Sequence, residues 1–320
     1  MRPVYKVLVT GVGGGVGQSV LRSLENSVYQ CVAYDSSPLA AGLYMSDESY
    51  LGLNATDPNY PEDVLSAAMR FGCSFIIPGH DIELLQLEKF RNEFRLAGIE
   101  LVLSEKYLLE LADDKYRTSF ELKHLGFDPP QTWHFTEFQW SENPVILKPR
   151  KGGARSKRTY LASNRREFER YSQMTDIENT VVQEYCPGEE FTCGTLTFEG
   201  KFHGSIVMKR ELRAGDTYKA FSIKDSAIMD TLEKLCNSLR PQGPCNFQLK
   251  LQDGRVRVFE INARFSGTTF LRKLCGFDEV LYTLNLISNQ TLPSLSWHEK
   301  TILRYWSELM IDNSELKLRN

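Results

Sequence analysis

Three polar side chains of different chemistry stand at the end of a largely apolar, strand-like segment. Glu260, Asn262 and Arg264 follow Val256–Phe259, with one residue between successive members. Because side chains on a strand alternate between its two faces, these three share one face. Carboxylate and amide oxygens are ligands for Mg²⁺, and a guanidinium binds phosphate. Surface exposure would account for an acid and an arginine but not for this polar series, so we predict a magnesium- and phosphate-binding face.

The preceding strand offers a further oxygen ligand, Gln248. A two-residue turn at Asp253-Gly254 would pair Gln248 with Phe259. Gln248 and Glu260 would then lie on opposite faces of the hairpin. A three-residue loop that includes Gln252 shifts the register by one residue and brings both onto one face. Gln248 and Glu260 can hold the same metal only if they share a face. We therefore predict the three-residue loop if the metal hypothesis is right.

A basic loop follows a second strand, which ends at Lys148. Residues Arg150–Arg158 place five cations around Gly152-Gly153. Free backbone N–H groups and positive charge allow such a loop to fold over polyphosphate and exclude water. A solvated surface loop is the alternative, and this segment by itself does not decide between them.

Residues Val181–Phe191 join an apolar strand to acids around a Pro187-Gly188 turn. The backbone groups at a strand end can bind an adenine edge, and a following carboxylate can accept both ribose hydroxyls. The segment is therefore a candidate for nucleotide binding.

The glycine run Gly11–Gly17, with Asp35 some twenty residues later, superficially matches a dinucleotide-binding fingerprint. Its spacing, however, is G-x-G-x-x-x-G, and a tight turn between a strand and a helix explains it more simply. We expect this turn to line a substrate pocket, where a helix N-terminus attracts anions. The phosphate loop GxxxxGK[ST] and the motifs G-x-S-x-G and H-E-x-x-H are absent from the sequence.

The elements that must position these residues change in character along the chain. Residues 1 to about 105 alternate strand and helix, which predicts an open α/β unit with a parallel sheet. The later residues predict an α+β body built mostly from antiparallel hairpins. The expected strands are 6–10, 31–34, 75–78, 100–103, 145–148, 159–161, 181–184, 191–198, 202–208, 246–251 and 255–261, and the expected helices are 61–71, 82–97, 115–125, 165–174 and 226–239.

Composition excludes several classes of protein. The chain has 320 residues, 42% hydrophobic and 25% charged, which is ordinary for two or three globular units. A net charge of −3 gives no reason to expect nucleic acid or an anionic membrane as a partner. Seven scattered cysteines and five histidines argue against zinc or disulfides, and no signal-like or membrane-spanning run is present. We expect a cytoplasmic protein, and a homo-oligomer remains open.

In their order along the chain, these segments resemble the ATP-grasp superfamily, and within it the carbamoyl-phosphate-synthase-like proteins with a single grasp unit. The motifs that carry the resemblance are Asp114-Lys115, Lys148-Pro149, the glycine loop, Gln183–Tyr185, Pro187-Gly188-x-Glu190, Phe247-x-x-x-Leu251 and Glu260-x-Asn262-x-Arg264. The resemblance implies a Rossmann-like pre-ATP-grasp domain (residues 1–108). It implies an ATP-grasp fold of two α+β subdomains (residues 109–186 and 187–320) after it.

The resemblance also assigns roles to individual residues. The implied ATP-binding residues are Lys115, Lys148, Gly152, Gly153, Ser156, Glu184, Tyr185, Glu190 and Gln248, with Glu184 and Tyr185 at the adenine and Glu190 at the ribose. Gln248, Glu260 and Asn262 would bind Mg²⁺, and Arg264 and Lys148 would be catalytic. The candidate substrate residues are Gly14, Asp81, Arg210, Arg264, Ser266 and Gly267. Gln248 departs from the family pattern, since many relatives place an acid there, and the loop is more basic than in most relatives.

The family implies an ATP- and Mg²⁺-dependent ligase. It would phosphorylate a carboxylate to an acyl phosphate and transfer the acyl group to an amine, both being small molecules. An ATP-dependent kinase that stops at the phosphorylated product is one alternative. A dinucleotide-binding oxidoreductase that uses Gly11–Gly17 is the other.

Overall fold

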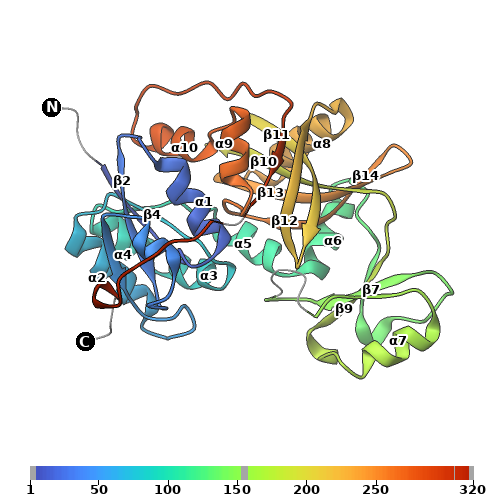
Figure 1. Ribbon diagram of the computed structural model, residues 1–320. Helices are drawn as coiled ribbons and strands as arrows, with labels where there is room; N and C mark the ends of the chain where they lie inside the picture. The colour runs from blue at the N-terminus through green and yellow to red at the C-terminus, as the bar shows by residue number, and fades with distance from the viewer. Residues whose placement is uncertain (1–4, 153–157, 306, 317–320) are drawn as a thin grey trace.

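The computed structural model describes residues 5–152, 158–305 and 307–316. Its first unit is a parallel sheet in the order β3-β2-β1-β4-β5 (Figure 1). The strands are β1 (Tyr5–Val9), β2 (Tyr29–Asp35), β3 (Glu48–Leu51), β4 (Phe75–Ile77) and β5 (Glu100–Leu101), and the helices are α1 (Gly15–Leu24), α2 (Tyr60–Phe71), α3 (Asp81–Lys89) and α4 (Arg91–Leu96), with a 3-10 turn η1 (Ala41–Tyr44). All strand pairs in this sheet are parallel, which confirms the predicted α/β unit.

Helix boundaries follow local sequence signals. Gly126, with φ of 84°, lies just beyond the end of α6 (Lys115–His124), as predicted. The helical pattern predicted over residues 82–97 is two helices that meet at Phe90, whose φ of −102° and ψ of 12° interrupt the helical backbone. Helix α5 (Lys106–Asp113) and the strand β3 are additional elements.

A small antiparallel sheet follows, in the order β6-β9-β7-β8. It comprises β6 (Thr132–His134), β7 (Val145–Pro149), β8 (Tyr160–Ala162) and β9 (Thr180–Glu184), with α7 (Arg165–Ser172) and the 3-10 turns η2 (Phe135–Glu137) and η3 (Ile177–Asn179). This unit has a core of its own, built on Val145, Leu147, Ala162 and Val182. In Figure 1 its elements β7, β9 and α7 project away from the parallel sheet.

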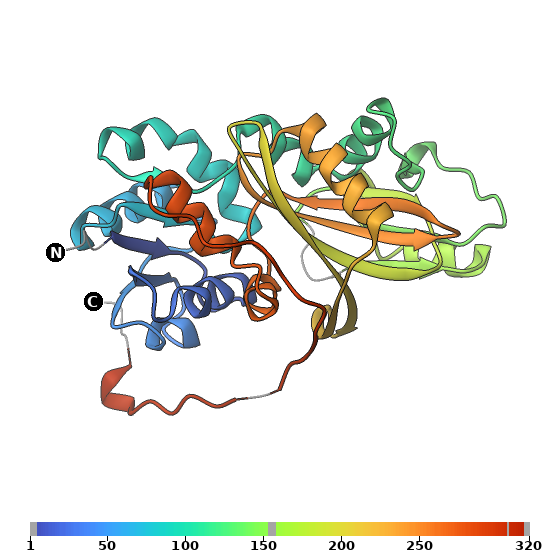
Figure 2. The same ribbon diagram turned by 90° about the horizontal axis from the view of Figure 1, so that it is seen from above.

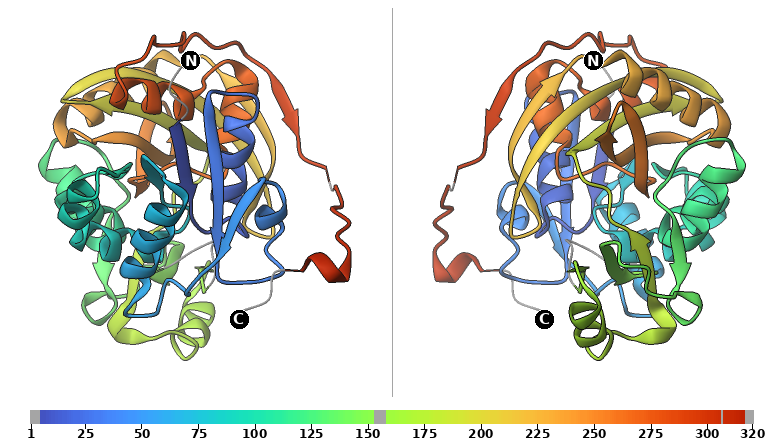
Figure 3. Two further views of the ribbon diagram at one scale, coloured as in Figure 1. Left: turned by 90° about the vertical axis from the view of Figure 1, so that its left-hand side faces the viewer. Right: turned by 90° about the vertical axis from the view of Figure 1, so that its right-hand side faces the viewer.

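A larger antiparallel sheet completes the fold, in the order β14-β13-β10-β11-β12-β15. Its strands are β10 (Glu189–Phe198), β11 (Lys201–Arg213), β12 (Asp216–Ile223), β13 (Gly243–Gln252), β14 (Arg255–Asn262) and β15 (Thr301–Leu303), and its helices are α8 (Ser226–Leu239), α9 (Thr269–Cys275) and α10 (Glu279–Ile287). Figure 2 shows α8 lying along this sheet. The predicted antiparallel α+β body is therefore confirmed. After β15 the chain runs along the outside of the molecule to a 3-10 turn, η4 (Asn313–Glu315) (Figure 3).

The turn between β13 and β14 differs from the prediction. Gln252 pairs with Arg255, so the turn has two residues, Asp253 and Gly254, both with positive φ (49° and 75°). The register then shifts between Gln248 and Leu249, which pairs Gln248 with Glu260. A β-bulge therefore brings these two side chains onto one face, and the predicted three-residue loop is wrong.

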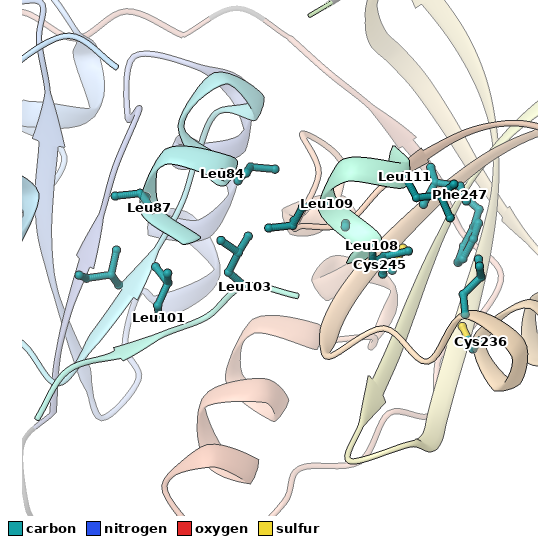
Figure 4. Close-up of a cluster of buried hydrophobic side chains, with 14 of the residues drawn as sticks. Leu84, Leu87, Leu101, Leu103, Leu108, Leu109, Leu111, Cys236, Cys245 and Phe247 are labelled. Carbon is teal, nitrogen blue, oxygen red and sulfur yellow. The ribbon is translucent and has the colours of Figure 1, made fainter. Parts of the chain in front are cut away.

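The largest hydrophobic core joins the first unit to the large sheet. It contains Leu87 and Leu101 of the first unit, Leu109 of α5, and Phe247 of β13 (Figure 4). A second core packs α1 against α9 and α10, for example through Leu284. Because the first unit and the large sheet share these cores, they hold each other in place, while the small sheet has a separate core. The predicted division at residues 108 and 186 stays a prediction. No helix in the described part of the chain is long and apolar enough to cross a membrane.

Candidate active site

A cavity of about 590 Å³ lies where the three units meet. Most of the predicted site residues line it: Gly14, Asp81, Lys115, Lys148, Glu184, Glu190, Arg210, Gln248, Glu260, Asn262, Arg264, Ser266 and Gly267. Tyr185 and Gly152 do not line it, and Gly153 and Ser156 lie outside the described residues. The structure therefore gathers residues more than 250 positions apart in one space.

The centre of the cavity is a polar patch on the large sheet. Gln248 lies opposite Glu260, and Asn246 lies opposite Asn262, so two cross-strand pairs of oxygen-bearing side chains share one face. Asn246 did not figure among the predicted site residues. Its position two residues before Gln248 on the same strand is the signal that could have found it.

Glu260 supplies the carboxylate of this patch. It is half-buried, and it makes no hydrogen bond or ion pair with another residue in the described part of the chain. Gln248 Oε1 accepts a hydrogen bond from Arg210 at 2.7 Å, and Asn262 Oδ1 accepts a longer one from Arg264 at 3.4 Å. One free carboxylate flanked by two amide oxygens is a donor set that suits Mg²⁺, which prefers oxygen ligands and keeps several waters. The residues present therefore fit the metal that the sequence predicts.

Two lysines face this patch from the other units. Lys148 on β7 is buried, and its Nζ donates to Gln183 Oε1 at 2.8 Å and lies 5.5 Å from the centre of the Phe259 ring. Burial lowers the pKa of Lys148 to about 8, although the nearby Glu260 acts in the opposite direction. Lys115 is also buried and begins α6. Two ammonium groups on the wall of one cavity can bind phosphate oxygens together.

The capping residue of α6 also secures the start of the basic loop. Asp114 accepts hydrogen bonds from the backbone of Tyr116 and Arg117, and Arg150 donates to both of its carboxylate oxygens at 2.7 to 3.0 Å. Burial alone would raise the pKa of Asp114. The hydrogen bonds from Arg150 and from the backbone of Arg117 outweigh burial, so the pKa of Asp114 is lowered. Arg150, at the start of the loop, is thereby fixed next to Lys115, whose backbone N–H donates to the carbonyl oxygen of Arg150 at 3.1 Å.

Glu190, the predicted ribose ligand, is engaged in ion pairs. Arg210 donates to its Oε1 from two nitrogens at 2.6 and 2.9 Å, and Lys250 lies 3.6 Å from its Oε2. Lys250 also lines the cavity and could have been found from its alternation with Gln248 on β13. The ribose role of Glu190 stays a prediction, and it requires that a bound ligand share this carboxylate with Arg210.

The predicted adenine segment is held by a buried arginine. Arg257 donates to Glu184 Oε2 at 2.7 Å and to the carbonyl oxygen of Asp128 at 3.1 Å. The backbone N–H of Tyr185 donates to the carbonyl oxygen of Pro144. Cys186, one residue further on, lines the cavity instead of Tyr185. The adenine role of Glu184 and Tyr185 stays a prediction.

The loop that carries Asp81 is fixed by a buried glutamate. Glu83 accepts hydrogen bonds from the backbone of Gly79 and His80, each at 2.8 Å, and from the hydroxyl of Thr10 at 2.8 Å. Burial raises the pKa of Glu83, which these hydrogen bonds partly offset. A Cβ at position 79 would lie 2.1 Å from the carbonyl oxygen of Thr10, so only glycine fits there. The loop therefore holds Asp81 at a fixed point on the cavity wall.

Asp81 forms an ion pair with Arg264 from the opposite unit. Arg264 Nε donates to Asp81 Oδ1 at 2.6 Å, and Nη2 donates to Oδ2 at 2.5 Å. Burial opposes the charged form of Asp81, but Arg264 outweighs it, so the pKa of this carboxyl is lowered. The pair connects two predicted site residues, whose contact no sequence pattern indicates.

The glycine turn lines the same end of the cavity, as expected. Gly13, Gly14 and Gly15 are on the wall, and Asp35 stands beside them. Asp35 accepts a hydrogen bond from the backbone of Gly13 at 2.7 Å and another from Ser37 at 2.9 Å. Both carboxylate oxygens thus support the turn. The substrate role of Gly14 stays a prediction.

Arg304 is a cavity residue that the sequence analysis missed. It follows β15, hydrogen-bonds through its guanidinium to the carbonyl oxygen of Gly267, and lines the cavity close to Ser266. Burial lowers the pKa of Arg304. No local motif surrounds it, and only the pairing of β15 with β12 brings it to the site.

A buried ionic network lies directly behind the patch. Arg272 and Glu279 are about 1% exposed and form an ion pair at 2.9 Å. Arg272 Nη2 donates a hydrogen bond to Asn246 Oδ1. The same oxygen accepts a hydrogen bond from the hydroxyl of Thr192 at 2.8 Å. Among the described residues, Arg272 Nε has no partner. The network fixes the amide of Asn246 at the cavity wall.

Two family models match separate parts of the chain. A model described as ATP-grasp in the biosynthetic pathway with Ter operon matches residues 176–306, and a model of the PylC-like N-terminal domain matches residues 7–102. The chain belongs to the ATP-grasp superfamily. Multifunctional protein ura1 of Schizosaccharomyces pombe is 21% identical to this ATP-grasp protein in an alignment of 247 residues that covers 70% of this chain. The chain spans only 11% of that relative's length.

Solved structures share the fold of this ATP-grasp chain at low identity. An ADP complex of purK, an N5-carboxyaminoimidazole ribonucleotide synthetase, has a TM-score of 0.74 and 11% identity, covering 93% of this chain and 80% of that one. The biotin carboxylase domain of Hydrogenobacter thermophilus 2-oxoglutarate carboxylase, with MgADP and bicarbonate, has a TM-score of 0.71 and 17% identity (91% and 71% covered). An L-amino acid ligase from Bacillus licheniformis has a TM-score of 0.69 and 16% identity (89% and 74% covered).

Proposed function

We propose that this chain is an ATP- and Mg²⁺-dependent ligase that activates a carboxylate as an acyl phosphate and transfers the acyl group to an amine. The observation that carries the proposal is the carboxylate of Glu260, which forms no hydrogen bond or ion pair with the other residues that the structure describes. It stands on an oxygen-rich strand face, with Lys148 and Arg264 as its charged neighbours. This arrangement suits a polyphosphate held by cations and a metal.

The charged cavity residues come from different units. Lys148 is on β7 of the small sheet, Lys250 is on β13 of the large sheet and Lys115 begins α6, and these three can hold nucleotide phosphates. Arg264 and the glycine turn lie toward the first unit, where a carboxylate can bind. Mg²⁺, when bound by Glu260, Asn262 and Gln248, would neutralise charge on the transferred phosphate. The γ-phosphate would therefore sit between these lysines and Arg264.

The proposed reaction has two steps. A substrate carboxylate oxygen, oriented by Arg264, attacks the γ-phosphorus, and the bond from that phosphorus to the β,γ-bridging oxygen breaks to release ADP. An amine nitrogen then attacks the acyl carbon, inorganic phosphate leaves, and the nitrogen loses a proton. Phosphoryl transfer depends mainly on positioning and charge neutralisation. Lys148 and Lys115 would supply positive charge to the phosphate oxygens, and this reaction does not require a histidine base.

The relatives support this class of reaction without choosing the acceptor. The solved structures with this fold include an L-amino acid ligase and a carboxylase domain with MgADP and bicarbonate. ATP-dependent activation of a carboxylate is a chemistry that both kinds of reaction can share, and the amine acceptor is the part of the proposal that needs a direct test.

The test uses acids labelled with ¹⁸O in the carboxylate, incubated with ATP, Mg²⁺ and a panel of amines. An acyl phosphate route transfers one ¹⁸O atom to the released inorganic phosphate, and mass spectrometry of the products shows the amide. A stable phosphorylated acid without amide would favour the kinase alternative. Release of unlabelled phosphate at the same rate with and without any acid would contradict both.

A further inference from the structure

The Asp81–Arg264 pair leaves little of the guanidinium free for a substrate. Arg264 donates from Nε and Nη2 to Asp81, from Nη2 to Asn262 Oδ1 at 3.4 Å and from Nη1 to the carbonyl oxygen of Phe265 at 2.7 Å. Four of its five N–H groups are thus used. A substrate carboxylate that binds Arg264 in two-point fashion must therefore take the place of Asp81.

Such a displacement has an electrostatic cost that depends on the substrate. The side chain of Asp81 is 37% exposed and that of Arg264 only 12%. A simple carboxylate would capture Arg264 and leave Asp81 facing it as an uncompensated anion. His80 and Lys115 are nearby groups that could compensate. His80 accepts a hydrogen bond from the backbone of Ile82 at Nδ1, and the proposed function assigns Lys115 to nucleotide phosphate. A like charge beside a partly buried carboxylate is unfavourable.

A substrate that carries its own cation avoids this cost. We infer that the activated acid is an amino acid whose ammonium group binds Asp81 while its carboxylate binds Arg264. The two charged groups of the substrate then replace one ion pair by two, and no charge is left unpaired. Because Asp81 and Arg264 are in direct contact, the ammonium must lie close to the carboxylate, on the same carbon or the next one. An α- or β-amino acid meets this condition.

The rest of this cavity end agrees with a zwitterion. Asp35 provides a second carboxylate on the same wall, and Gly13–Gly15 leave room beside it. Besides the Asp81–Arg264 pair, the charged lining residues at this end include Asp35 and Arg304, which are also of opposite sign. A wall whose formal charge is already balanced before ligand binding favours a substrate without net charge over an anion.

This inference rests on the proposed function. Its test distinguishes a failure of the amino-acid inference from a failure of the proposed function. Purified protein receives ATP, Mg²⁺ and hydroxylamine, which traps an acyl phosphate as a hydroxamate, so that no acceptor amine needs to be known. The acids come in matched pairs: L-alanine with propionate, L-glutamate with glutarate, and β-alanine with propionate. Phosphate release and hydroxamate formation are measured for each, and binding of an ATP analogue is measured by calorimetry as a separate readout.

At least one amino acid should give hydroxamate, with kcat/KM at least about 10²-fold above that of its deaminated partner, since the site is built to pair an ammonium. Equal or better turnover of the deaminated acid would overturn the inference. Nucleotide binding without turnover of any amino acid would also overturn it, while leaving ATP binding intact. A protein that binds no nucleotide would refute the proposed function and the inference with it.

Substitutions at Asp81 test whether this residue is the ammonium ligand. Asp81→Asn should lower kcat/KM for the amino acid by about 10²-fold, mainly by raising KM. It should also reduce the ratio of kcat/KM for the amino acid to kcat/KM for the deaminated acid. Asp230→Asn, on the exposed face of α8, is the matched control. It should leave kcat/KM for the amino acid and the preference for the amino acid unchanged. Asp81→Glu keeps the charge and should recover part of the activity. If Asp81→Asn binds the ATP analogue normally and shows unchanged acid kinetics in hydroxylamine, Asp81 is not the ammonium ligand.

Discussion

Gln248 lies directly opposite Glu260 because one residue, Phe259, is extra in β14 at that point of the ladder. Regular alternation would send Phe259 and Glu260 to opposite faces of the sheet, yet both line the cavity. The bulge thus places an aromatic ring below Lys148 and a carboxylate beside it. Bulges are common next to functional sites because they redirect a side chain at little cost to the rest of the strand.

Glu260→Gln should abolish most ATP turnover while the fold survives. The amide keeps the size of the side chain but removes the carboxylate that we propose as the main metal ligand. Loss of one preorganised electrostatic contact of this kind costs about 10²–10³ in kcat. Steady-state ADP release at saturating Mg²⁺ measures the effect. Glu233→Gln, on the exposed side of α8, is the matched control. Near-normal turnover of Glu260→Gln would remove Glu260 from the metal site.

Much of this architecture could be predicted from the sequence because its signals are local. Alternation of apolar residues and the Gly126 stop signal predict strands and helices that the structure contains. The series at Glu260, Asn262 and Arg264 needs only the two-residue period of a strand to define a shared face. Local patterns of this kind also predicted the parallel sheet of the first unit.

The parts that could not be predicted depend on long-range packing. The register of the β13–β14 hairpin is set by a bulge whose sequence signal is weak, so the turn was predicted wrongly while the shared face was right. Asp81 and Arg264 are 183 residues apart, and only the joint core of the first unit and the large sheet brings them into contact. Arg304 reaches the cavity through an edge strand of three residues. None of these contacts leaves a pattern in the sequence.

NAD(H) should not bind at the glycine turn. The glycine spacing, G-x-G-x-x-x-G, lacks the usual dinucleotide fingerprint, and Asp35, the residue that would hold the ribose, supports the local backbone by accepting N–H groups from Gly13 and Ser37. Calorimetric titration with NADH and with an ATP analogue compares the two cofactors directly, and only the analogue should bind. Micromolar affinity for NADH that is lost in Asp35→Ala but kept in Asp230→Ala would instead establish the oxidoreductase.

Gly194→Ala should destabilise the protein, because β10 passes against the guanidinium of Arg272. A Cβ at Gly194 would lie 2.3 Å from Arg272 Nη1, and Arg272 is fully buried and bound to Glu279. Overpacking of this kind costs about 1–3 kcal/mol in the free energy of unfolding. Urea unfolding of Gly194→Ala measures it. Gly15→Ala is the control, because a Cβ there meets open space, and its effect should stay within about 0.5 kcal/mol. Equal stability of the two variants would show that Arg272 can move aside.

The affinity for nucleotide should fall as the pH rises through the pKa of Lys148. Burial lowers that pKa to about 8 in the free protein, so the side chain is an ammonium below this pH and increasingly neutral above it. Bound phosphate favours the ammonium and raises the pKa in the complex, so binding above pH 8 must take up a proton. The dissociation constant of an ATP analogue with Mg²⁺ should therefore be flat below about pH 7.5 and rise by up to about tenfold per pH unit above about 8.5. Calorimetry in buffers of different ionisation enthalpy measures both the affinity and the proton uptake.

Lys148→Arg provides the comparison that assigns this pH dependence to Lys148. A guanidinium stays protonated throughout this range, so the variant should bind the analogue with an affinity that changes little between about pH 7 and 9.5 and without proton uptake. Lys148→Met should bind weakly at every pH, because the charge is absent throughout. The analogue should be one whose last phosphate pKa lies near 6, as in ordinary phosphate esters, so that its oxygens are ionised above pH 7.5 and do not contribute to the rise. If Lys148→Arg retains the same dependence as the wild type, another group is responsible, and Lys148 does not contact the phosphates as an ammonium.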